Sequence, residues 1–575
     1  MLELLKTSLA SSLSEATGFP ASDILPLLER PRNPEHGDLA FPCFQLAKSL
    51  KKAPADCARV LSERLGEVPG FMPATVVGPF LNFAFERTAF TRGVLEGSSR
   101  VHKSVALRNK NILVEYSSPN IAKPFHVGHL RATLIGNSLD RVYRFLNANV
   151  VSVNHLGDWG TQFGFVWAGC KLWGKPEQAT VAALVDLYRK ATALKEEQDN
   201  AGKEIPADDD VNLIARNYFI DLEAGADYAV EFWKWCLEIS LQYLKNTYKR
   251  LDINFDHYLG ESFYSDKLDT VTQSLTDAGI LNESEKALGV LLGEQDGEDL
   301  GFARITTPDG RSLYLARDLA AAEYRYQRFA FDESIYVVGA PQALHFKQMI
   351  AILKKLGKPY AEHIHHVAFG HVMGMKTRGG GSFIELNGFL DEARELALKA
   401  YREQVERRPE GLDEEMVAEA VAHAAIIFSN LSRTRIKDVH FSWENALAFQ
   451  GDSGPYLLYA YARTNGIREK SLTAGITGEG EIDFNRLTDE YSYSLAACIA
   501  DFSKALDMTI KDNDPAHLAN YGIQLAKNIS RAYNQLKVVG VEATLGNARL
   551  KLFLVAGETL KNTLQLLGIP VVERM

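Results

Sequence analysis

Two histidines frame a valine and a glycine in the most informative stretch of this chain, residues 114–131 (VEYSSPNIAKPFHVGHLR). His126 and His129 follow a short apolar segment and precede a helical pattern at 130–146. This order predicts a strand, a turn and a helix, and it places the histidines at a helix N-terminus, where backbone N–H groups favour phosphate. Imidazoles there can donate hydrogen bonds to a phosphate that gains charge as it is attacked. The motif therefore indicates nucleotide chemistry.

Paired histidines also occur as packed core residues and as metal ligands. A zinc-binding helix usually spaces its histidines i, i+4 with a glutamate between them, whereas the spacing here is i, i+3. We therefore expect no metal site. Ser118, Asn120 and Lys123 place polar groups just before the turn, and Pro119 favours an extended backbone there. These neighbours favour the phosphate-binding interpretation.

Two glycine-containing segments could approach a ligand closely. Gly157, Asp158 and Thr161 belong to the sequence GDWGTQ directly after the second predicted strand, where Asp158 could accept hydrogen bonds from a ribose or an amine. The alternative is an ordinary strand–helix turn. The loop 374–381 (GMKTRGGG) carries Lys376 and Arg378, which could clamp a pyrophosphate leaving group, although taken alone it also fits a solvated surface turn.

Two further positions suit a polar ligand pocket. Tyr314 and Asp318 lie four residues apart, so they share one face if the segment is helical. Gln342 comes just after the apolar segment 334–338, which predicts that it projects from the end of a strand into the same crevice.

Composition limits the class of protein. A chain of 575 residues with a net charge of −10 is long enough for several domains of roughly 100–200 residues each. The acidic balance argues against non-specific coating of nucleic acid, and it leaves room for RNA contact through local basic surfaces. Five scattered cysteines without a C-x-x-C pair fit a reducing, cytoplasmic setting.

No apolar run reaches the roughly 18 residues that a membrane span needs, so we expect no membrane contact. The N-terminal segment 1–19 is amphipathic and contains acidic residues, which predicts a helix and not a signal peptide.

The hydrophobic pattern divides the chain into three parts. Residues 1–105 predict a small α+β domain, and residues 446–575 predict an all-α helical bundle. Residues 106–445 predict an α/β domain, interrupted by an insertion of charged helices at about 174–300. Short apolar strands alternating with helices indicate a parallel, doubly wound sheet that binds ligands at the carboxyl ends of its strands; the strands are expected at 112–116, 150–155, 334–338 and 363–369.

Taken in order and spacing, these segments resemble the class I aminoacyl-tRNA synthetases, and among them the arginyl-tRNA synthetases. Residues 115–129 are similar to the HIGH signature with the upstream S-P-N-x-A-K of the arginine enzymes, and the loop 374–381 stands where the family carries its KMSKS loop. Residues 452–463 (DSGPYLLYAYAR) resemble the start of the helical anticodon-binding domain. HGDLA at 36–40 and GPFLN at 78–82 resemble the additional N-terminal, tRNA-binding domain.

The resemblance implies a Rossmann-type catalytic domain that joins L-arginine to the 3′-terminal adenosine of tRNA-Arg through an arginyl-adenylate. ATP would be used with Mg²⁺ as a substrate complex, no tightly bound cofactor is expected, and tRNA would have to be bound for the adenylate to form. The loop departs from the family pattern because it reads Met375-Lys376-Thr377-Arg378. Which of Lys376, Arg378 and Lys123 meets the pyrophosphate therefore stays open.

The resemblance also implies residue roles. The arginine pocket would consist of Glu115, Ser118, Asn120, His129, Tyr314, Asp318 and Gln342. ATP would contact His126, Gly128, His129, Gly157, Asp158, Thr161, Met375 and Lys376. The catalytic residues would be His126, His129, Lys123, Lys376 and Arg378, and tRNA would contact Tyr456, Tyr459 and Arg463.

Residue chemistry agrees with an arginine pocket, because a guanidinium is planar, always charged and matched by a carboxylate that binds it bidentately. Asp318 is the expected partner, with Glu115 beside it. Three alternatives remain: a different H-x-G-H nucleotidyltransferase, a class I synthetase for another amino acid, and a non-catalytic RNA-binding relative. We expect a monomeric enzyme in the cytoplasm.

Overall fold

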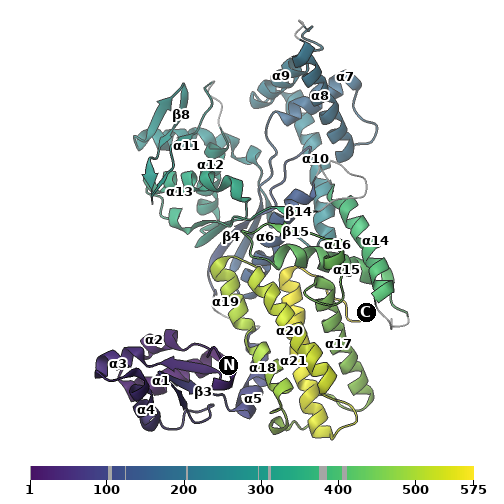
Figure 1. Ribbon diagram of the computed structural model, residues 1–575. Helices are drawn as coiled ribbons and strands as arrows, with labels where there is room; N and C mark the ends of the chain where they lie inside the picture. The colour runs from purple at the N-terminus through teal and green to yellow at the C-terminus, as the bar shows by residue number, and fades with distance from the viewer. Residues whose placement is uncertain are drawn as a thin grey trace.

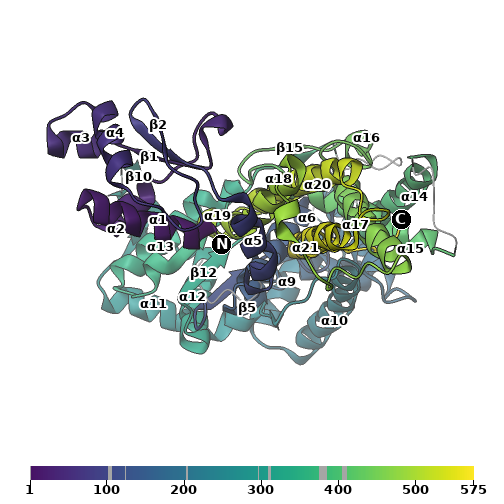
Figure 2. The same ribbon diagram turned by 90° about the horizontal axis from the view of Figure 1, so that it is seen from below.

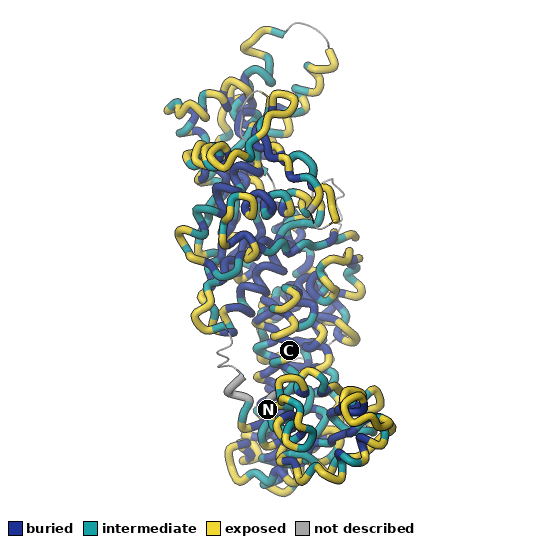
Figure 3. The backbone as a smooth tube through the Cα atoms, turned by 90° about the vertical axis from the view of Figure 1, so that its left-hand side faces the viewer, coloured by how far each residue is buried: buried dark blue, intermediate teal, exposed yellow. Residues whose placement is uncertain are grey.

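The computed structural model describes residues 2–101, 107–123, 125–201, 205–295, 297–308, 313–374, 385–404 and 411–575. Figure 1 shows an elongated molecule in which the N-terminal part lies beside the C-terminal helices, at the far end from the helices α7–α10. Figure 3 shows buried backbone running along the middle of the molecule, with exposed segments concentrated at both tips. None of the described helices combines the length and the apolar character that a membrane crossing requires.

A five-stranded parallel sheet with the strand order β13-β12-β4-β5-β6 forms the centre of the molecule. Its strands are β4 (Asn111–Glu115), β5 (Asn149–Asn154), β6 (His257–Tyr258), β12 (Glu333–Tyr336) and β13 (Ile364–His366). The four predicted strands are therefore present, each within a few residues of its expected bounds. β6 was not predicted; it lies within the range 174–300 expected to be an insertion, so that range contributes a strand to the central sheet.

Alternating side chains of β4 pack on opposite faces of this sheet. Ile112 and Val114 join the core that contains α6 (Val127–Phe145) and the C-terminal helices. Leu113 joins a second core with α11 (Leu268–Asp277), α12 (Tyr314–Phe329) and α13 (Ala343–Lys355). Both faces are thus covered, which explains why the strands read as continuous apolar runs.

The segments between the central strands form two lobes, seen at the upper right and upper left of Figure 1. The first consists of helices α7 (Gln162–Trp173), α8 (Val181–Ala201), α9 (Val211–Glu223) and α10 (Asp227–Arg250). The second contains α11, α12, α13 and an antiparallel sheet of β7 (Leu281–Ser284), β8 (Ala287–Leu291) and β11 (Phe302–Arg304).

The N-terminal part is an α+β unit, as its pattern predicts. Its antiparallel sheet has the order β1-β3-β2, and its elements are α1 (Leu2–Thr17), β1 (Leu39–Pro42), α3 (Phe44–Leu50), α4 (Pro54–Arg64), β2 (Thr75–Val77) and β3 (Phe80–Phe83). It contacts the C-terminal helices, as Figure 2 shows from below: Tyr493 Oη donates to Asp38 Oδ1 (2.7 Å), and Arg30 pairs with Asp501 (2.7 Å).

The C-terminal part is helical, in agreement with the periodicity. Its longest helices are α17 (Gly454–Thr473), α20 (Ala516–Gln535) and α21 (Ala543–Leu567), with the shorter α18 (Glu490–Ala500) and α19 (Phe502–Asp512) beside them. α21 packs on α6 of the central domain, where Ser138 Oγ donates to the carbonyl of Leu566 (2.9 Å). The bundle and the central sheet therefore share one core through α6.

Two pairs of linking elements complete the path of the chain. α14 (Leu386–Gln404) and α15 (Glu414–Leu431) pack against each other, and α15 also contacts α6 and the bundle helix α17. β14 (Val372–Met373) pairs in parallel with β15 (Val439–His440), directly before the loop predicted at 374–381. Of that loop only Gly374 belongs to the described residues.

Candidate active site

A cavity of about 610 Å³ opens at the carboxyl ends of β4 and β12. The chain leaves β4 toward β5 on one side and later returns to β12 on the other side, so the cavity lies where the strand order reverses, the usual ligand site of such a sheet. Nine predicted residues line it: Glu115, Ser118, Asn120, Gly128, His129, Gly157, Tyr314, Asp318 and Gln342. They come from four separate segments of the chain, 115–129, 157, 314–318 and 342.

The two histidines occupy the N-terminus of α6 as a reciprocal cap. The Gly128 amide donates to Nδ1 of His126 (3.0 Å), and the His126 amide donates to Nδ1 of His129 (3.3 Å). Burial lowers the pKa of His129 to about 3, an effect to which His126 and Lys123 add, and burial also lowers the pKa of His126. A neutral imidazole that accepts a hydrogen bond at Nδ1 carries its proton on Nε2. The Nε2 atoms of His126 and His129 are therefore hydrogen-bond donors.

Asp318 is the carboxylate best placed for a cationic ligand. His345 Nε2 lies 2.6 Å from Asp318 Oδ2, and His155 Nε2 lies 3.9 Å from Asp318 Oδ1. Burial raises the pKa of Asp318, but the His345 hydrogen bond and the nearby His155 and Arg325 outweigh it and leave the pKa below its usual value. Asp318 is therefore ionised at neutral pH.

Glu115 lines the same cavity and already has a cationic partner. It forms an ion pair with Arg325 of α12, and both side chains are buried. Arg325 also lies near the Tyr264 hydroxyl (3.3 Å) and Nδ1 of His155 (3.3 Å). Breaking such a buried pair would leave an uncompensated charge. The charge of Glu115 is thus balanced by Arg325.

Glu261 is a second buried carboxylate beside Asp318, and its Oε2 is buried without a hydrogen-bond partner among the described residues. Burial raises the pKa of Glu261 to about 8; Arg317 opposes this effect, whereas Asp318 and Asp158 add to it. A cationic ligand placed beside this carboxyl group would lower its pKa, because the cation favours the ionised form.

The segment 118–120 and the GDWG turn are joined directly. Asn120 and Gly157 form an isolated parallel bridge, in which the Gly157 amide donates to the carbonyl of Pro119 (3.1 Å) and the Ile121 amide to the carbonyl of Gly157 (3.0 Å). A Cβ added at Gly157 would overlap Oδ1 of Asn120. Glycine at this position therefore allows the Asn120 side chain to cross the turn.

Asp158 and Thr161 do not belong to the cavity lining that the described residues form. The Asp158 carboxylate accepts two hydrogen bonds from Ser262, one from the amide (2.8 Å) and one from Oγ (2.6 Å). Trp233 Nε1 donates to the Asp158 carbonyl (2.8 Å). Asp158 is buried in this arrangement. Thr161 is exposed at the start of α7.

The predicted cations are placed only in part. The Lys123 ammonium lies 6.0 Å from the ring centroid of Tyr188 on α8 and, like the His126 side chain, outside the described lining of the cavity. Met375, Lys376 and Arg378 lie outside the described residues. The segment that precedes them is held by Arg131 of α6, whose Nη1 donates to the carbonyl of Gly370 (2.7 Å). Glu385, which follows them, forms a bridge with His126.

The predicted tRNA-contacting residues differ in their surroundings. Tyr456 packs between helices, and its hydroxyl contacts Ser530 Oγ (3.1 Å). The Arg463 guanidinium lies 4.3 Å from the ring centroid of Tyr459 and 5.2 Å from that of Tyr533, an exposed tyrosine of α20. Tyr459, Arg463 and Tyr533 therefore form a partly exposed aromatic–cationic cluster, of which Tyr533 was not predicted.

Several cavity residues were missed from the sequence: His155, Glu261, Arg317, His345 and Phe369. His155 directly follows β5, so the rule that selected Gln342, a polar residue just after a strand, would also have selected His155. His345 lies inside α13, beyond the reach of that rule. Glu261 follows the two-residue strand β6, which carries no apolar pattern. No local signal identified it.

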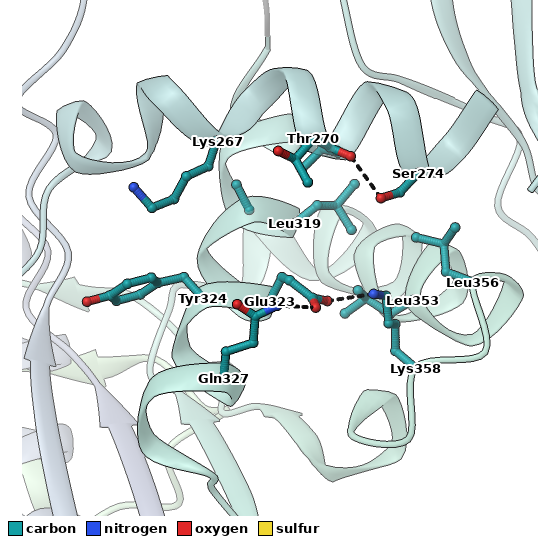
Figure 4. Close-up of a pocket in the computed structure, with 12 residues that line it drawn as sticks. Lys267, Thr270, Ser274, Leu319, Glu323, Tyr324, Gln327, Leu353, Leu356 and Lys358 are labelled. Atoms are coloured by element: carbon teal, nitrogen blue, oxygen red, sulfur yellow. Dashed lines mark hydrogen bonds and ion pairs between the residues drawn. The ribbon is translucent and has the colours of Figure 1, made fainter. Parts of the chain in front are cut away.

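A second cavity, of about 240 Å³, lies on the other face of α12 (Figure 4). Leu319, Leu353 and Leu356 give it apolar walls, and Glu323 pairs with Lys358 (2.8 Å) at one side. Among the described residues, its lining includes none that the sequence predicted for chemistry.

Comparison with known proteins identifies the family. Residues 94–443 match the model described as tRNA synthetases class I (R), catalytic domain; residues 457–575 match the DALR anticodon binding domain; and residues 3–85 match the arginyl tRNA synthetase N terminal domain. The chain is 38% identical to an arginine–tRNA ligase of Clostridium perfringens over 99% of this chain and 100% of the relative. It is 36% identical, with the same coverage, to one of Ligilactobacillus salivarius.

Solved structures agree on the fold. The arginyl-tRNA synthetase of Thermus thermophilus matches with a TM-score of 0.81 at 24% identity, over 99% of both chains. That of Plasmodium falciparum matches with a TM-score of 0.81 at 25% identity, over 99% of this chain and 98% of the other. The chain belongs to the arginyl-tRNA synthetase family of class I aminoacyl-tRNA synthetases.

Proposed function

We propose that this protein ligates L-arginine to tRNA-Arg, using ATP and passing through an arginyl-adenylate. The observation that carries the proposal is a single cavity at the switch point of the sheet. It holds an ionised carboxylate, Asp318, and the helix N-terminus with His129. The first feature suits the guanidinium of arginine, and the second suits phosphate.

Arginine would lie with its guanidinium against Asp318 and Glu261, in a cavity that Glu115, paired with Arg325, also lines. Tyr314 at the cavity mouth would cover the side chain of the substrate. Ser118 Oγ, which is buried without a hydrogen-bond partner among the described residues, and Asn120 would contact the α-amino and carboxylate groups. The ammonium group of lysine lacks the planar set of N–H donors with which a guanidinium binds carboxylates, and the side chain of citrulline carries no charge.

Activation is an in-line displacement in which the arginine carboxylate attacks the α-phosphate and pyrophosphate leaves. The carboxylate is already a nucleophile at neutral pH, so no general base is required. Neutral His126 and His129 would donate from Nε2 to oxygens that gain charge, and positioning would supply most of the remaining acceleration. Magnesium would enter with ATP as part of the substrate. Lys123, Lys376 and Arg378 remain the proposed contacts of pyrophosphate.

We assign tRNA binding to residues 1–105 and 446–575, with the cluster Tyr459, Arg463 and Tyr533 facing unpaired bases, since aromatic rings and guanidinium groups stack on such bases. We further propose that the enzyme acts as a monomer in the cytoplasm. Sedimentation velocity at micromolar concentration tests the monomer, and a concentration-dependent dimer would contradict it.

Aminoacylation of a tRNA-Arg transcript tests the function directly. Labelled arginine should appear on the tRNA in an ATP-dependent reaction, and labelled lysine and citrulline should not. A second transcript, tRNA-Lys, serves as the control for tRNA identity. A chain that charges no tRNA with arginine under these conditions would contradict the proposal.

A further inference from the structure

The backbone between β4 and Asn120 makes a strained turn. Ser117 has φ +74°, and the Ser118 amide donates to the carbonyl of Tyr116 (3.0 Å), two residues earlier. A hydrogen bond between residues two apart around a central φ near +75° is the pattern of the rare, strained γ-turn. Ser118 also has a positive φ, +46°. Two consecutive non-glycine residues in this region persist only when their surroundings hold them.

Buried polar side chains surround this turn. Ser117 Oγ lies 2.7 Å from the Tyr248 hydroxyl and 2.8 Å from Thr133 Oγ1. Asn154 at the end of β5 donates from Nδ2 to the Tyr248 hydroxyl (3.0 Å) and accepts from the Ser118 amide at Oδ1 (3.2 Å). All four side chains are buried. The hydroxyl of Tyr248 therefore links both residues of the turn, Ser117 directly and Ser118 through Asn154.

Tyr248 comes from α10, more than one hundred residues after the turn. Its ring is packed between Phe125 (centroids 5.4 Å apart) and Phe255 (5.1 Å). A phenylalanine at this position would keep this packing and lose only the hydroxyl. Among the side chains of α10, Tyr248 thus supplies the hydroxyl that bonds the turn at Ser117, whereas Ser240 Oγ accepts from the Ala122 amide (3.4 Å) farther along the same segment.

The direction of the turn decides where the next side chains lie. Ser118 and Asn120 enter the cavity immediately after it, and Asn120 then crosses Gly157. We propose that Tyr248 is a positioning residue for arginine: its hydroxyl holds the γ-turn at Ser117, and the turn aims Ser118 and Asn120 at the substrate. This inference rests on the proposed function.

Tyr248→Phe tests the proposal in tRNA-dependent ATP–pyrophosphate exchange. Loss of the hydroxyl, with its hydrogen bonds to Ser117 and Asn154, should lower kcat/KM for arginine about tenfold, mainly through a higher KM, with a small change in the melting temperature. The matched control is Tyr218→Phe. Tyr218 is also buried in the helical lobe, and its hydroxyl donates to the carbonyl of Ala229 (2.8 Å), away from the cavity. This control should leave the KM for arginine unchanged.

Glycine at position 117 separates positioning from general stability, because glycine adopts a positive φ at little cost. In a Ser117→Gly background, Tyr248→Phe should change kcat/KM for arginine by less than about twofold. This non-additivity is expected if residues 117 and 248 act as one unit. Ser117→Ala removes the same hydrogen bond from its other end and should raise the KM for arginine as Tyr248→Phe does; it carries the test if Tyr248→Phe does not fold.

Two results would overturn the inference while leaving the enzyme's identity intact. The first is an unchanged KM for arginine in both Tyr248→Phe and Ser117→Ala. The second is that Tyr248→Phe lowers kcat/KM for arginine by the same factor whether residue 117 is serine or glycine. Absence of arginine-dependent exchange in the unmodified protein would instead contradict the proposed function.

Discussion

At the scale of single residues, Asp318 carries the distinction between arginine and neutral analogues. A charge-assisted hydrogen bond is worth about 1.5–3 kcal/mol, so Asp318→Asn should lower kcat/KM for arginine by roughly 10- to 150-fold. Discrimination against citrulline should fall by a similar factor, because the variant offers no charge. Steady-state aminoacylation with both amino acids measures this. Asp56→Asn, at an exposed ion pair with Arg59, is the control, and equal losses in the two variants would contradict the assignment.

Glu261 gives the arginine pocket a pH dependence with a definite sign. With a pKa raised to about 8 by burial, Glu261 is mostly protonated at pH 7 in the free enzyme. A guanidinium favours the ionised form, so arginine binding should release a proton and should tighten as the pH rises toward 8. The KM for arginine should therefore decrease between pH 6.5 and 8.5.

Glu261→Gln removes the titrating group and should abolish this slope, while it raises the KM for arginine at pH 8.5. Titration calorimetry in buffers of different ionisation enthalpy would detect the released proton independently. A slope that survives in Glu261→Gln would assign the pH dependence to another group. The imidazoles of His126 and His129 are poor candidates for it, since burial lowers both of their pKa values.

At the scale of elements, the contact between the segment 118–120 and the GDWG turn is sensitive to side-chain volume. Gly157→Ala would push its methyl group into Oδ1 of Asn120, so Asn120 must leave the cavity. We expect a loss of roughly tenfold or more in exchange activity, from overpacking and one lost contact of about 1–3 kcal/mol. Gly466→Ala on α17, where the added Cβ would meet open space, is the control and should be neutral. Full activity in Gly157→Ala would contradict this geometry.

The elements also show what the sequence could and could not predict. β4, β5 and β12 were predictable because most of their residues are buried and each carries apolar residues at successive positions. β6 has two residues, His257 and Tyr258, and no such run. The pairing of Glu115 with Arg325 joins positions 210 apart, and only the folded sheet brings α12 to the end of β4. The hydrogen bond between Tyr248 and Ser117 could not be predicted either, because it also joins residues that are far apart in the sequence.

At the scale of the whole molecule, the helical bundle stabilises the catalytic domain as well as binding tRNA. Removal of residues from about 450 onward would uncover the face of α6 that α21 covers, so loss of charging in such a truncation would not isolate the role of the bundle. A surface substitution separates the two effects.

Arg463→Ala dismantles the cluster with Tyr459 and Tyr533 and keeps α17 intact. If these side chains stack on bases, the KM for tRNA should rise by roughly 3- to 30-fold, the range for a lost cation–π or stacking contact. The melting temperature should stay close to that of the parent protein. Arg304→Ala, in the lobe of β7, β8 and β11, is the control. An unchanged KM for tRNA would contradict the proposal that Arg463 contacts tRNA.

One cavity must select the amino acid and activate it, and ATP–pyrophosphate exchange measures both steps together. Each of the twenty amino acids should be assayed with and without tRNA-Arg, at saturating ATP and magnesium. We predict exchange with arginine alone, and only when the tRNA is present. Exchange that proceeds with another amino acid, or that fails with arginine and tRNA together, would contradict the assignment of this cavity.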